Sequence, residues 1–376
     1  MRVTHTLPVS VSAATLYVAF ELGAKTWKLG LTSGLATPPW VKGVAAGDWA
    51  AIGRVVERAK ARFGLPASAA VRSCYEAGRD GFWIHRALAR LGIENRVVDS
   101  ASIDVNRRRR RAKTDRLDAR KLVMKLVRVR LGDRDAWREV HVPSEADEAA
   151  RHVSRERTQL TQERTRLVNQ LRSWLTTVGA ALPARRPDGW WTSVRDWAGT
   201  VLPAPVQDRL ARAHARLQVI ERQLATLTQT QRAAVTTAAA DSPLRRLIRV
   251  KGVAVTGASV LLDEGLVWRD FRNRRQVGGM LGFTPVPYQS GEQARDQGID
   301  RAGNSRWRAL SVQLAWRWVQ WQPDSALTRW YDARFGGSGP RARRIGIVAL
   351  ARKLLVALWR YVTTGVVPAG ATLKTA

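Results

Sequence analysis

Two pairs of acidic residues in this chain are candidates for binding a metal ion. Asp115 and Asp118 lie three positions apart in NRRRRRAKTDRLDARKL (106–122), directly after five consecutive arginines. Glu21 and Glu76 end two apolar, strand-like runs, TLYVAFEL and AAVRSCYE. Active sites of α/β folds gather at the edge where strands end. Four converging carboxylates could hold divalent metal ions for in-line attack on a phosphodiester.

The helical spacing of the aspartate pair is compatible with two interpretations. In a helix over TDRLDARKLVMKLVRV, Asp115 shares a face with Ala119 and Leu122, and Asp118 lies one turn before Leu122. Both carboxylates are then expected over the apolar stripe, facing a sheet. Alternatively, they are helix N-terminal charges paired with nearby arginines, worth a few tenths of a kcal/mol per pair. This spacing alone favours neither interpretation.

Oxygen ligands are the ones that this chain offers to a metal. Cys74 is the single cysteine, and the five histidines are scattered without ligand spacing. Carboxylate oxygens favour Mg²⁺ or Mn²⁺. Asp99 and Asp104 are further carboxylates in the same region.

Ser290 is a candidate nucleophile in LGFTPVPYQSGE, a Pro/Gly-flanked segment that we expect to be a loop. The one histidine of the later half, His214, falls in a predicted helix, which argues against a hydrolase triad. A serine among arginines suits a phosphoryl target, although a lone Ser–Gly is more commonly a turn or a helix cap. The arginines that follow it, which we expect to bind nucleic acid, are Arg295, Arg301, Arg306 and Arg308.

Three segments must position these residues. Residues 1–142 alternate strand and helix in the order strand, strand, helix, strand, helix, strand, helix, which predicts an α/β domain with a mixed sheet. The Gly/Pro-rich stretch SGLATPPWVKG (33–43) obscures a third strand. Residues 143–241 carry a helix-start signal at Ser144 and leucine heptads that predict two long helices with a coiled-coil seam. A hairpin within one chain and a dimerising coil are equally compatible with the heptads.

Residues 242–376 are expected to be mainly helical. LIRVKGVAVTGASVLLDEG (247–265) has the form of a helix-hairpin-helix, whose backbone amides can approach a phosphate. PRARRIGIVALARKLLVALWRYV, from Pro340 onwards, predicts a late amphipathic helix with a basic start.

The charge of the chain indicates a polyanionic partner. Lys and Arg number 63 against 31 Asp and Glu, so the formal net charge is 63 − 31 = +32, spread along 376 residues. Nucleic acid is the leading partner. The densest cationic run, and the first candidate for binding it, consists of Arg107, Arg108, Arg109, Arg110, Arg111 and Lys113.

A membrane partner finds no support in the sequence. Arg352 and Lys353 interrupt the most apolar late stretch, which is also too short to cross a bilayer. With no evident signal peptide, cytoplasm is expected.

An ordered set of motifs resembles the insertion-sequence one-ten (IS-one-ten) transposases, also called DEDD transposases or bridge-RNA-guided recombinases. The set runs from about residue 15 to 362 and comprises YVAFELGAKTWKL, CYEAGRDGFWIHRAL, VVDSASIDVNRRRRRAKTDRLDARKL, LIRVKGVAVTGASVLLDEG, LGFTPVPYQSGE, GIDRAGNSRWRAL and VALARKLLVALWRY. The resemblance implies a RuvC-like (RNase H fold) domain, a coiled-coil segment and a C-terminal transposase domain. It also places the four metal-binding acids at Glu21, Glu76, Asp115 and Asp118 and the serine nucleophile at Ser290. The family's first acid is usually aspartate, and here it is Glu21.

The resemblance further implies site-specific recombination of donor and target DNA, guided by a structured non-coding RNA. It implies dimers or tetramers, and a bacterial cytoplasmic protein that acts on the nucleoid. Two other functions fit the residues. A junction-resolving nuclease would need the acids and not the serine, whereas a non-catalytic nucleic-acid-packaging protein would need neither.

Overall fold

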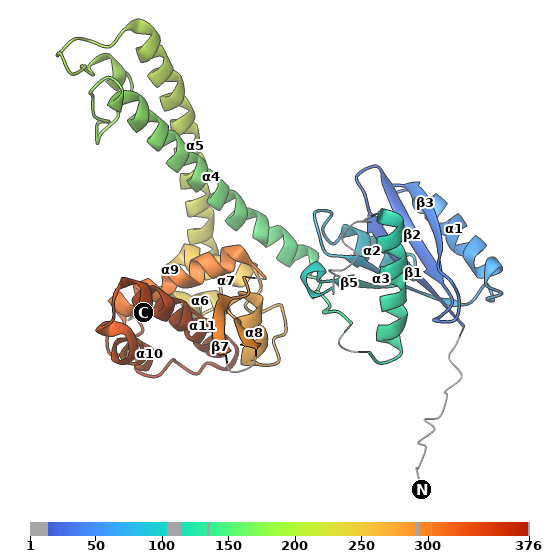
Figure 1. The fold of residues 1–376 in the computed structure, drawn as a ribbon. Helices are drawn as coiled ribbons and strands as arrows, with labels where there is room; N and C mark the ends of the chain where they lie inside the picture. Colours follow the sequence, from blue (N-terminus) through green and yellow to red (C-terminus); the bar gives the residue numbers. More distant parts are fainter. Residues whose placement is uncertain (1–13, 104–113, 134–135, 291–292, 302, 375–376) are drawn as a thin grey trace. The chain divides into compact units, whose positions relative to one another are not determined.

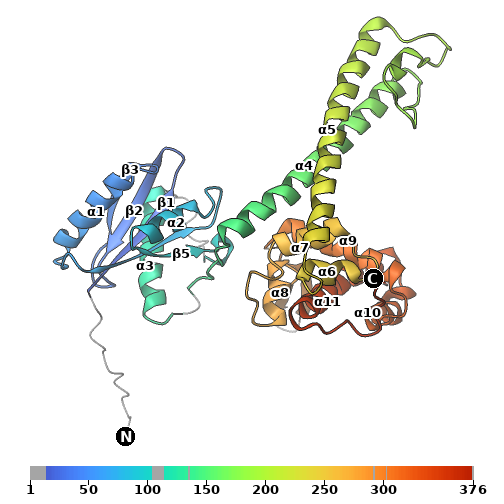
Figure 2. The same ribbon diagram turned by 180° about the vertical axis from the view of Figure 1, so that it is seen from behind.

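The computed structural model describes residues 14–103, 114–133, 136–290, 293–301 and 303–374. The chain divides into two units, Met1–Val142 and Pro143–Ala376, and each is described by itself. Figures 1 and 2 show their elements from two sides.

The first unit is built on a mixed five-stranded sheet. Its strands are β1 (Thr15–Leu22), β2 (Thr26–Thr32), β3 (Trp40–Ala45), β4 (Ala70–Glu76) and β5 (Glu94–Val98). They lie in the order β3-β2-β1-β4-β5, with β1 antiparallel to β2 and parallel to β4. The predicted mixed sheet is confirmed, and β3 is the strand that the Gly/Pro-rich stretch obscured.

Helices cover both faces of this sheet, because its central strands are apolar on both sides. Three helices do so: α1 (Trp49–Arg62), α2 (Trp83–Arg90) and α3 (Asp115–Arg130), with the short helix η1 (Ser100–Ser102) before α3. Leu16, Val18 and Phe20 of β1 pack with residues of α1 and α2. The alternate residues Tyr17 and Ala19 pack instead with α3.

A glycine lets α3 lie close to the sheet. Gly30 of β2 is paired with Ala19 of β1. A Cβ atom at position 30 would lie 2.5 Å from the carbonyl oxygen of Ala119. Only glycine therefore permits this approach, which brings the N-terminal half of α3 down onto the central strands.

The second unit begins with two long helices, α4 (Glu145–Thr176) and α5 (Ala204–Thr237), joined by a segment that contains η3 (Trp190–Thr192). Ser144 caps α4 by accepting the Asp147 amide, as its sequence signal predicts. Leucines at heptad spacing, including Leu160, Leu167, Leu210 and Leu217, form the shared core of the pair. The two helices therefore pack on each other within one chain (Figure 1).

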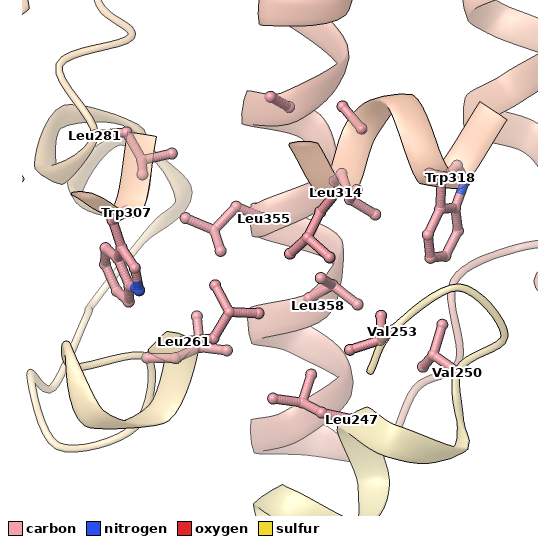
Figure 3. Close-up of a cluster of buried hydrophobic side chains, with 14 of the residues drawn as sticks. Leu247, Val250, Val253, Leu261, Leu281, Trp307, Leu314, Trp318, Leu355 and Leu358 are labelled. Carbon is pink, nitrogen blue, oxygen red and sulfur yellow. The ribbon is translucent and has the colours of Figure 1, made fainter. Parts of the chain in front are cut away.

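The rest of the second unit is helical apart from one β-hairpin. Its helices are α6 (Pro243–Arg249), α7 (Val255–Asp263), α8 (Arg274–Met280), α9 (Ser305–Trp321), α10 (Ala326–Tyr331), η4 (Asp332–Gly336) and α11 (Pro340–Thr364). The hairpin consists of β6 (Pro285–Ser290) and β7 (Gln293–Ile299). Leu355 and Leu358 of α11 lie in the core beside Leu261, Leu314 and Trp307 (Figure 3). Within the described residues, no helix has the length and apolarity needed to cross a membrane.

Candidate active site

The two strand-end glutamates lie side by side on the sheet. Strands β1 and β4 are parallel, and their register runs to Phe20 opposite Tyr75. Glu21 and Glu76 are the next residues on each strand, and both are half-buried. Because side chains alternate along a strand, they project to the face of Ala19 and Cys74, the face that α3 covers.

The direction of α3 brings the aspartate pair to the same edge. Arg130, at the C-terminal end of α3, is ion-paired with Glu94, the first residue of β5. The helix therefore runs opposite to β4 and β5, which are parallel. Its N-terminal turn, with Asp115 and Asp118, accordingly lies at the carboxyl ends of the parallel strands.

The aspartates differ in environment, so the expectation that both face the sheet is half right. The side chain of Asp118 is 23% exposed, and its Oδ1 lies 3.3 Å from the Lys121 ammonium. Asp115 is exposed, although Ala119 and Leu122 on its face are buried. Helical side chains point towards the N-terminus, so a residue in the first position projects beyond the packed part of its helix.

These four carboxylates have the chemistry of a magnesium site and form an open arrangement. Among the described residues, no group of three or more acidic, histidine or cysteine side chains gathers closely enough to hold a metal ion. Mg²⁺ usually takes one or two protein carboxylates and completes its shell with water and substrate phosphates. The donor set therefore fits an ion shared between the protein and a nucleic acid phosphate.

The thiol next to these acids is unsuited to catalysis. Cys74 is fully buried, and burial, reinforced by the charge of Glu76, raises the pKa of its thiol well above the usual range. A neutral buried thiol is a poor nucleophile.

The cationic run expected to bind nucleic acid lies outside the described residues, as does one of the alternative acids. The structure therefore neither places these side chains beside the carboxylates nor separates them. They are Arg107, Arg108, Arg109, Arg110, Arg111, Lys113 and Asp104. The other alternative acid, Asp99, is described and lies between β5 and η1.

Ser290 is the last residue of β6, whereas the sequence predicts a loop there. It pairs with Gln293 of β7 across the hairpin. The runs PVPYQS and QARDQGI flank only Gly291 and Glu292, a spacing typical of a hairpin that the prolines concealed. The structure does not describe the side chains of residues 287–297, which include Ser290 and Arg295.

Two of the other three cations, Arg306 and Arg308, hold the segment that follows the hairpin. Arg308 donates to the carbonyl oxygens of Leu281 (2.9 Å) and Arg301 (3.0 Å), on the two sides of the hairpin base. Arg301 itself is exposed and has a left-handed φ of 59°. Arg306 donates to Thr158 of α4 at 2.7 Å and to the Ser154 carbonyl. In this structure the guanidinium groups of Arg306 and Arg308 are engaged by the protein.

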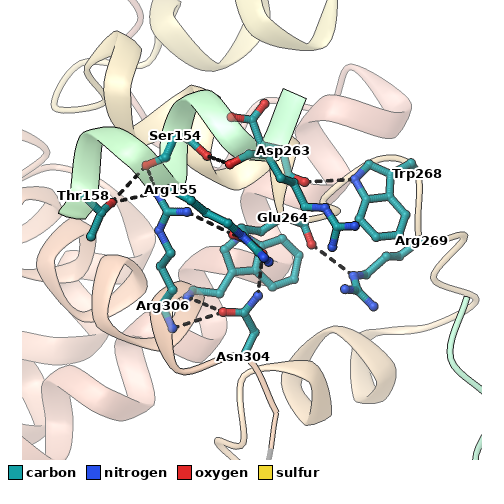
Figure 4. Close-up of polar contacts among 11 residues, drawn as sticks. Ser154, Arg155, Thr158, Asp263, Glu264, Trp268, Arg269, Asn304 and Arg306 are labelled. Atoms are coloured by element: carbon teal, nitrogen blue, oxygen red, sulfur yellow. Dashed lines mark hydrogen bonds and ion pairs between the residues drawn. The ribbon is translucent and has the colours of Figure 1, made fainter. Parts of the chain in front are cut away.

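A buried glutamate that no sequence motif indicated lies at the centre of a polar cluster (Figure 4). Glu264, at the end of α7, is 1% exposed and accepts hydrogen bonds from Arg155 (3.1 and 3.2 Å), Arg306 (3.1 Å) and Asn304 (2.8 Å). Burial by itself raises the pKa of Glu264, but these donors bring it below its ordinary value. Asp263 next to it keeps a pKa raised to about 6, chiefly by burial.

This cluster joins α4, α7 and the start of α9. Asn304 also caps α9 by accepting the Arg306 and Trp307 amides. Glu264→Ala would leave the largely buried Arg306 and the half-exposed Arg155 without their carboxylate, so we expect it to destabilise this part of the second unit by about 1–3 kcal/mol. Hydrogen exchange of α7 and α9 amides in the full chain measures the change.

Glu221→Ala is the matched control for the Glu264 variant. Glu221 forms an exposed pair with Arg164 at 3.2 Å, between α5 and α4. Exposed pairs are worth ~0.2–1 kcal/mol, so exchange in this variant should stay near that of the unaltered protein. Equal protection in the two variants would show that the buried cluster contributes no more than a surface pair.

The segment resembling a helix-hairpin-helix has the predicted shape, with α6 and α7 flanking a turn at Lys251 and Gly252. The Lys251 amide donates to the Thr372 carbonyl at 3.1 Å. The Lys374 ammonium donates to the carbonyls of Ile248 (2.7 Å) and Val253 (3.0 Å). The C-terminal segment therefore holds this turn in place. The Lys251 amide, which could have approached a phosphate, already donates to a protein carbonyl.

Two family models match the chain. A model described as the Transposase IS116/IS110/IS902 family matches residues 244–330, the part that contains Ser290 and Glu264. A DEDD model of the IS110 type, described as Transposase, matches residues 73–179. The second range includes Glu76, Asp115 and Asp118 but not Glu21.

Two proteins of Sinorhizobium fredii and one of Pseudomonas aeruginosa, all named as transposases, are similar to the chain. One, y4rJ, is 38% identical and covers 98% of this chain and 96% of its own length. Another, y4qE, is 30% identical over 84% of this chain and 80% of its own length. The third, from Pseudomonas aeruginosa and named in family 20, is 29% identical over 60% of this chain and 67% of its own length.

A mixed sheet with acids at one edge, a strongly basic chain and these matches define the class: the protein is a DNA transposase, an enzyme of DNA recombination. The chain belongs to the IS110/IS116/IS902 family of insertion-sequence transposases. A DEDD transposase domain implies the use of divalent metal ions, and a transposase implies DNA as its partner.

Proposed function

We propose that this transposase cuts and rejoins DNA with Mg²⁺ or Mn²⁺ held by Glu21, Glu76, Asp115 and Asp118, and with Ser290 as the nucleophile. The observation that carries the proposal is the shared sheet edge of the four carboxylates. The acids belong to a RuvC-like (RNase H fold) domain at residues 1–142. Ser290 belongs to a C-terminal transposase domain at residues 242–376, and residues 143–241 form a coiled coil that supports assembly as dimers or tetramers.

The proposed chemistry is a pair of transesterifications. The Ser290 hydroxyl loses its proton, and its oxygen attacks phosphorus while the bond from phosphorus to one DNA oxygen breaks. A phosphoserine ester and a free DNA hydroxyl result. A hydroxyl of the other DNA then attacks this ester, which restores the serine and forms the new phosphodiester. The number of ester bonds is conserved, so no external energy source is needed.

Each group in the site has a defined role in this chemistry. A bound divalent ion supplies charge for the scissile phosphate and a Lewis acid for the leaving oxygen. The carboxylates hold the ion, and their placement on a rigid sheet edge fixes its position. Arginines and a lysine hold the remaining phosphates and give the binding a salt dependence. The residues proposed for this contact are Arg107, Arg108, Arg109, Arg110, Arg111, Lys113, Arg295 and Arg301.

We also propose a structured non-coding RNA, encoded beside the gene, as the guide that selects donor and target DNA. The charge of +32 could accommodate a second polyanion beside DNA. The test measures joined DNA in reactions that contain purified full-length protein, donor and target DNA, and RNA transcribed from the sequence that flanks the gene. Joined product should require the RNA and either Mg²⁺ or Mn²⁺, and chelation should remove it. Joining with chelator present would overturn the metal assignment, and joining without RNA would overturn the guide.

A further inference from the structure

Trp197 lies at the tip of the hairpin formed by α4 and α5 and is 82% exposed. The other tryptophans of this region are packed. Trp190 is buried and meets Trp191 and His214 edge to face, and Trp174 carries the Arg209 guanidinium 3.8 Å above its ring. Tryptophan is enriched among the residues that contribute most of the binding energy in interfaces.

The backbone beneath this ring is held firmly. Asp196 accepts the amides of Ala198 (2.9 Å) and Thr200 (2.8 Å) on its Oδ1, and its own amide donates to the Thr200 carbonyl (2.9 Å). The Trp197 amide donates to the Val178 carbonyl at 3.1 Å. Trp197 is therefore presented in a fixed place, and its exposure does not come from a loose chain end.

A glycine is required where the two sides of the tip meet. Gly179 has a left-handed φ of 73°, and a Cβ atom there would lie 2.6 Å from the Cβ of Trp197. The close approach fixes the tryptophan over the C-terminal end of α4. Holding an aromatic side chain in place before binding lowers the entropy lost on binding.

The charges near the tip identify the kind of partner. Arg195, two residues before Trp197, is exposed, as is Arg185 in the same connection between α4 and α5. The carboxylate of Asp196 is occupied by the turn, and that of Asp188 accepts from Gln218. A tip-to-tip contact between two copies would bring these arginines together in chains that each carry +32. Aromatic rings beside arginines suit single-stranded nucleic acid, where bases stack and phosphates are neutralised. We propose that Trp197 stacks on an unpaired nucleobase of the bound nucleic acid.

The test compares binding of labelled single-stranded DNA, single-stranded RNA and blunt duplex DNA by full-length Trp197→Ala and Trp197→Tyr. The alanine variant should bind the single-stranded form that this tip contacts roughly ten-fold more weakly. The Trp197→Tyr variant should recover most of the lost affinity. An oligonucleotide with abasic sites should bind the alanine and tyrosine variants equally. Trp316→Ala, which removes a 43% exposed tryptophan from α9, is the matched control and should bind normally.

The salt dependence of binding separates stacking from charge. Trp197→Ala should shift affinity without changing the slope of log affinity against log salt, whereas Arg195→Ala should reduce that slope by about 0.7–0.9. If only DNA binding or only RNA binding is weakened, that nucleic acid is the one that contacts the tip. Unchanged binding to both strands, or an equal loss on blunt duplex, overturns the proposal. Altered sedimentation with unchanged binding would instead make the tip a contact between copies. None of these measurements depends on Ser290 or the carboxylates.

Discussion

Asp118→Asn is expected to reduce recombination by at least about 100-fold while the first unit stays folded. Even a residue that only supports a metal ligand typically costs 10–100-fold when removed, and Asp118 is proposed as a ligand itself. Its folding role is small, because its ion pair with the exposed Lys121 is worth ~0.2–1 kcal/mol. Asparagine keeps the size of the side chain and removes the charge that would hold the metal.

The carboxylate at Glu57 provides the control for this experiment. Glu57 lies on α1, is 62% exposed and pairs with Lys60 at 3.2 Å, so Glu57→Gln also breaks an i,i+3 pair on a helix of the same unit. Joined DNA should form at the normal rate in that variant. Joining at the normal rate by Asp118→Asn would show that Asp118 is not a metal ligand. Partial recovery of Asp118→Asn in Mn²⁺ would support a ligand role, because Mn²⁺ binds most ligands more tightly than Mg²⁺ does.

The acidic edge was accessible to sequence analysis because it depends on short-range periodicity. Alternation along TLYVAFEL and AAVRSCYE placed Glu21 and Glu76 at strand ends, and both strands formed as predicted. Helical spacing placed Ala119 and Leu122 against the sheet. The same rule overestimated the burial of Asp115, since it takes no account of where a helix begins relative to the layer it covers.

The Glu264 cluster could not be read from the sequence in the same way. Its partners Arg155 and Arg306 are 109 and 42 residues away, and no periodic pattern links such positions. In VLLDEG the two acids look like a solvated helix end. Their place directly after three apolar residues of a short helix was the one available signal. The exposure of Trp197 could not be predicted either. It depends on a turn closed by Asp196 and on the close approach of Gly179, which composition does not reveal.

Ser290→Ala is expected to abolish both the covalent protein–DNA adduct and the joined product. Alanine has no oxygen with which to attack phosphorus, so no phosphoserine ester can form, and without it the second transfer has no donor. DNA binding should be unchanged, because the substitution removes no charge and binding depends mainly on phosphate contacts. Denaturing electrophoresis of protein incubated with end-labelled DNA measures the adduct, and the same reactions measure the joined strand.

Thr284→Ala is the control for the serine variant, since it removes an exposed hydroxyl at the base of the same hairpin. Thr284 bonds Asp300 through its backbone carbonyl, at 3.0 Å, so the hairpin base should persist. Adduct formation in this variant should be normal. If Ser290→Ala still cuts DNA and leaves no adduct, the acids alone would suffice and the enzyme would act as a nuclease. Loss of the adduct together with loss of cutting places the first bond-breaking step at Ser290, because a nuclease that activates water would retain its cut.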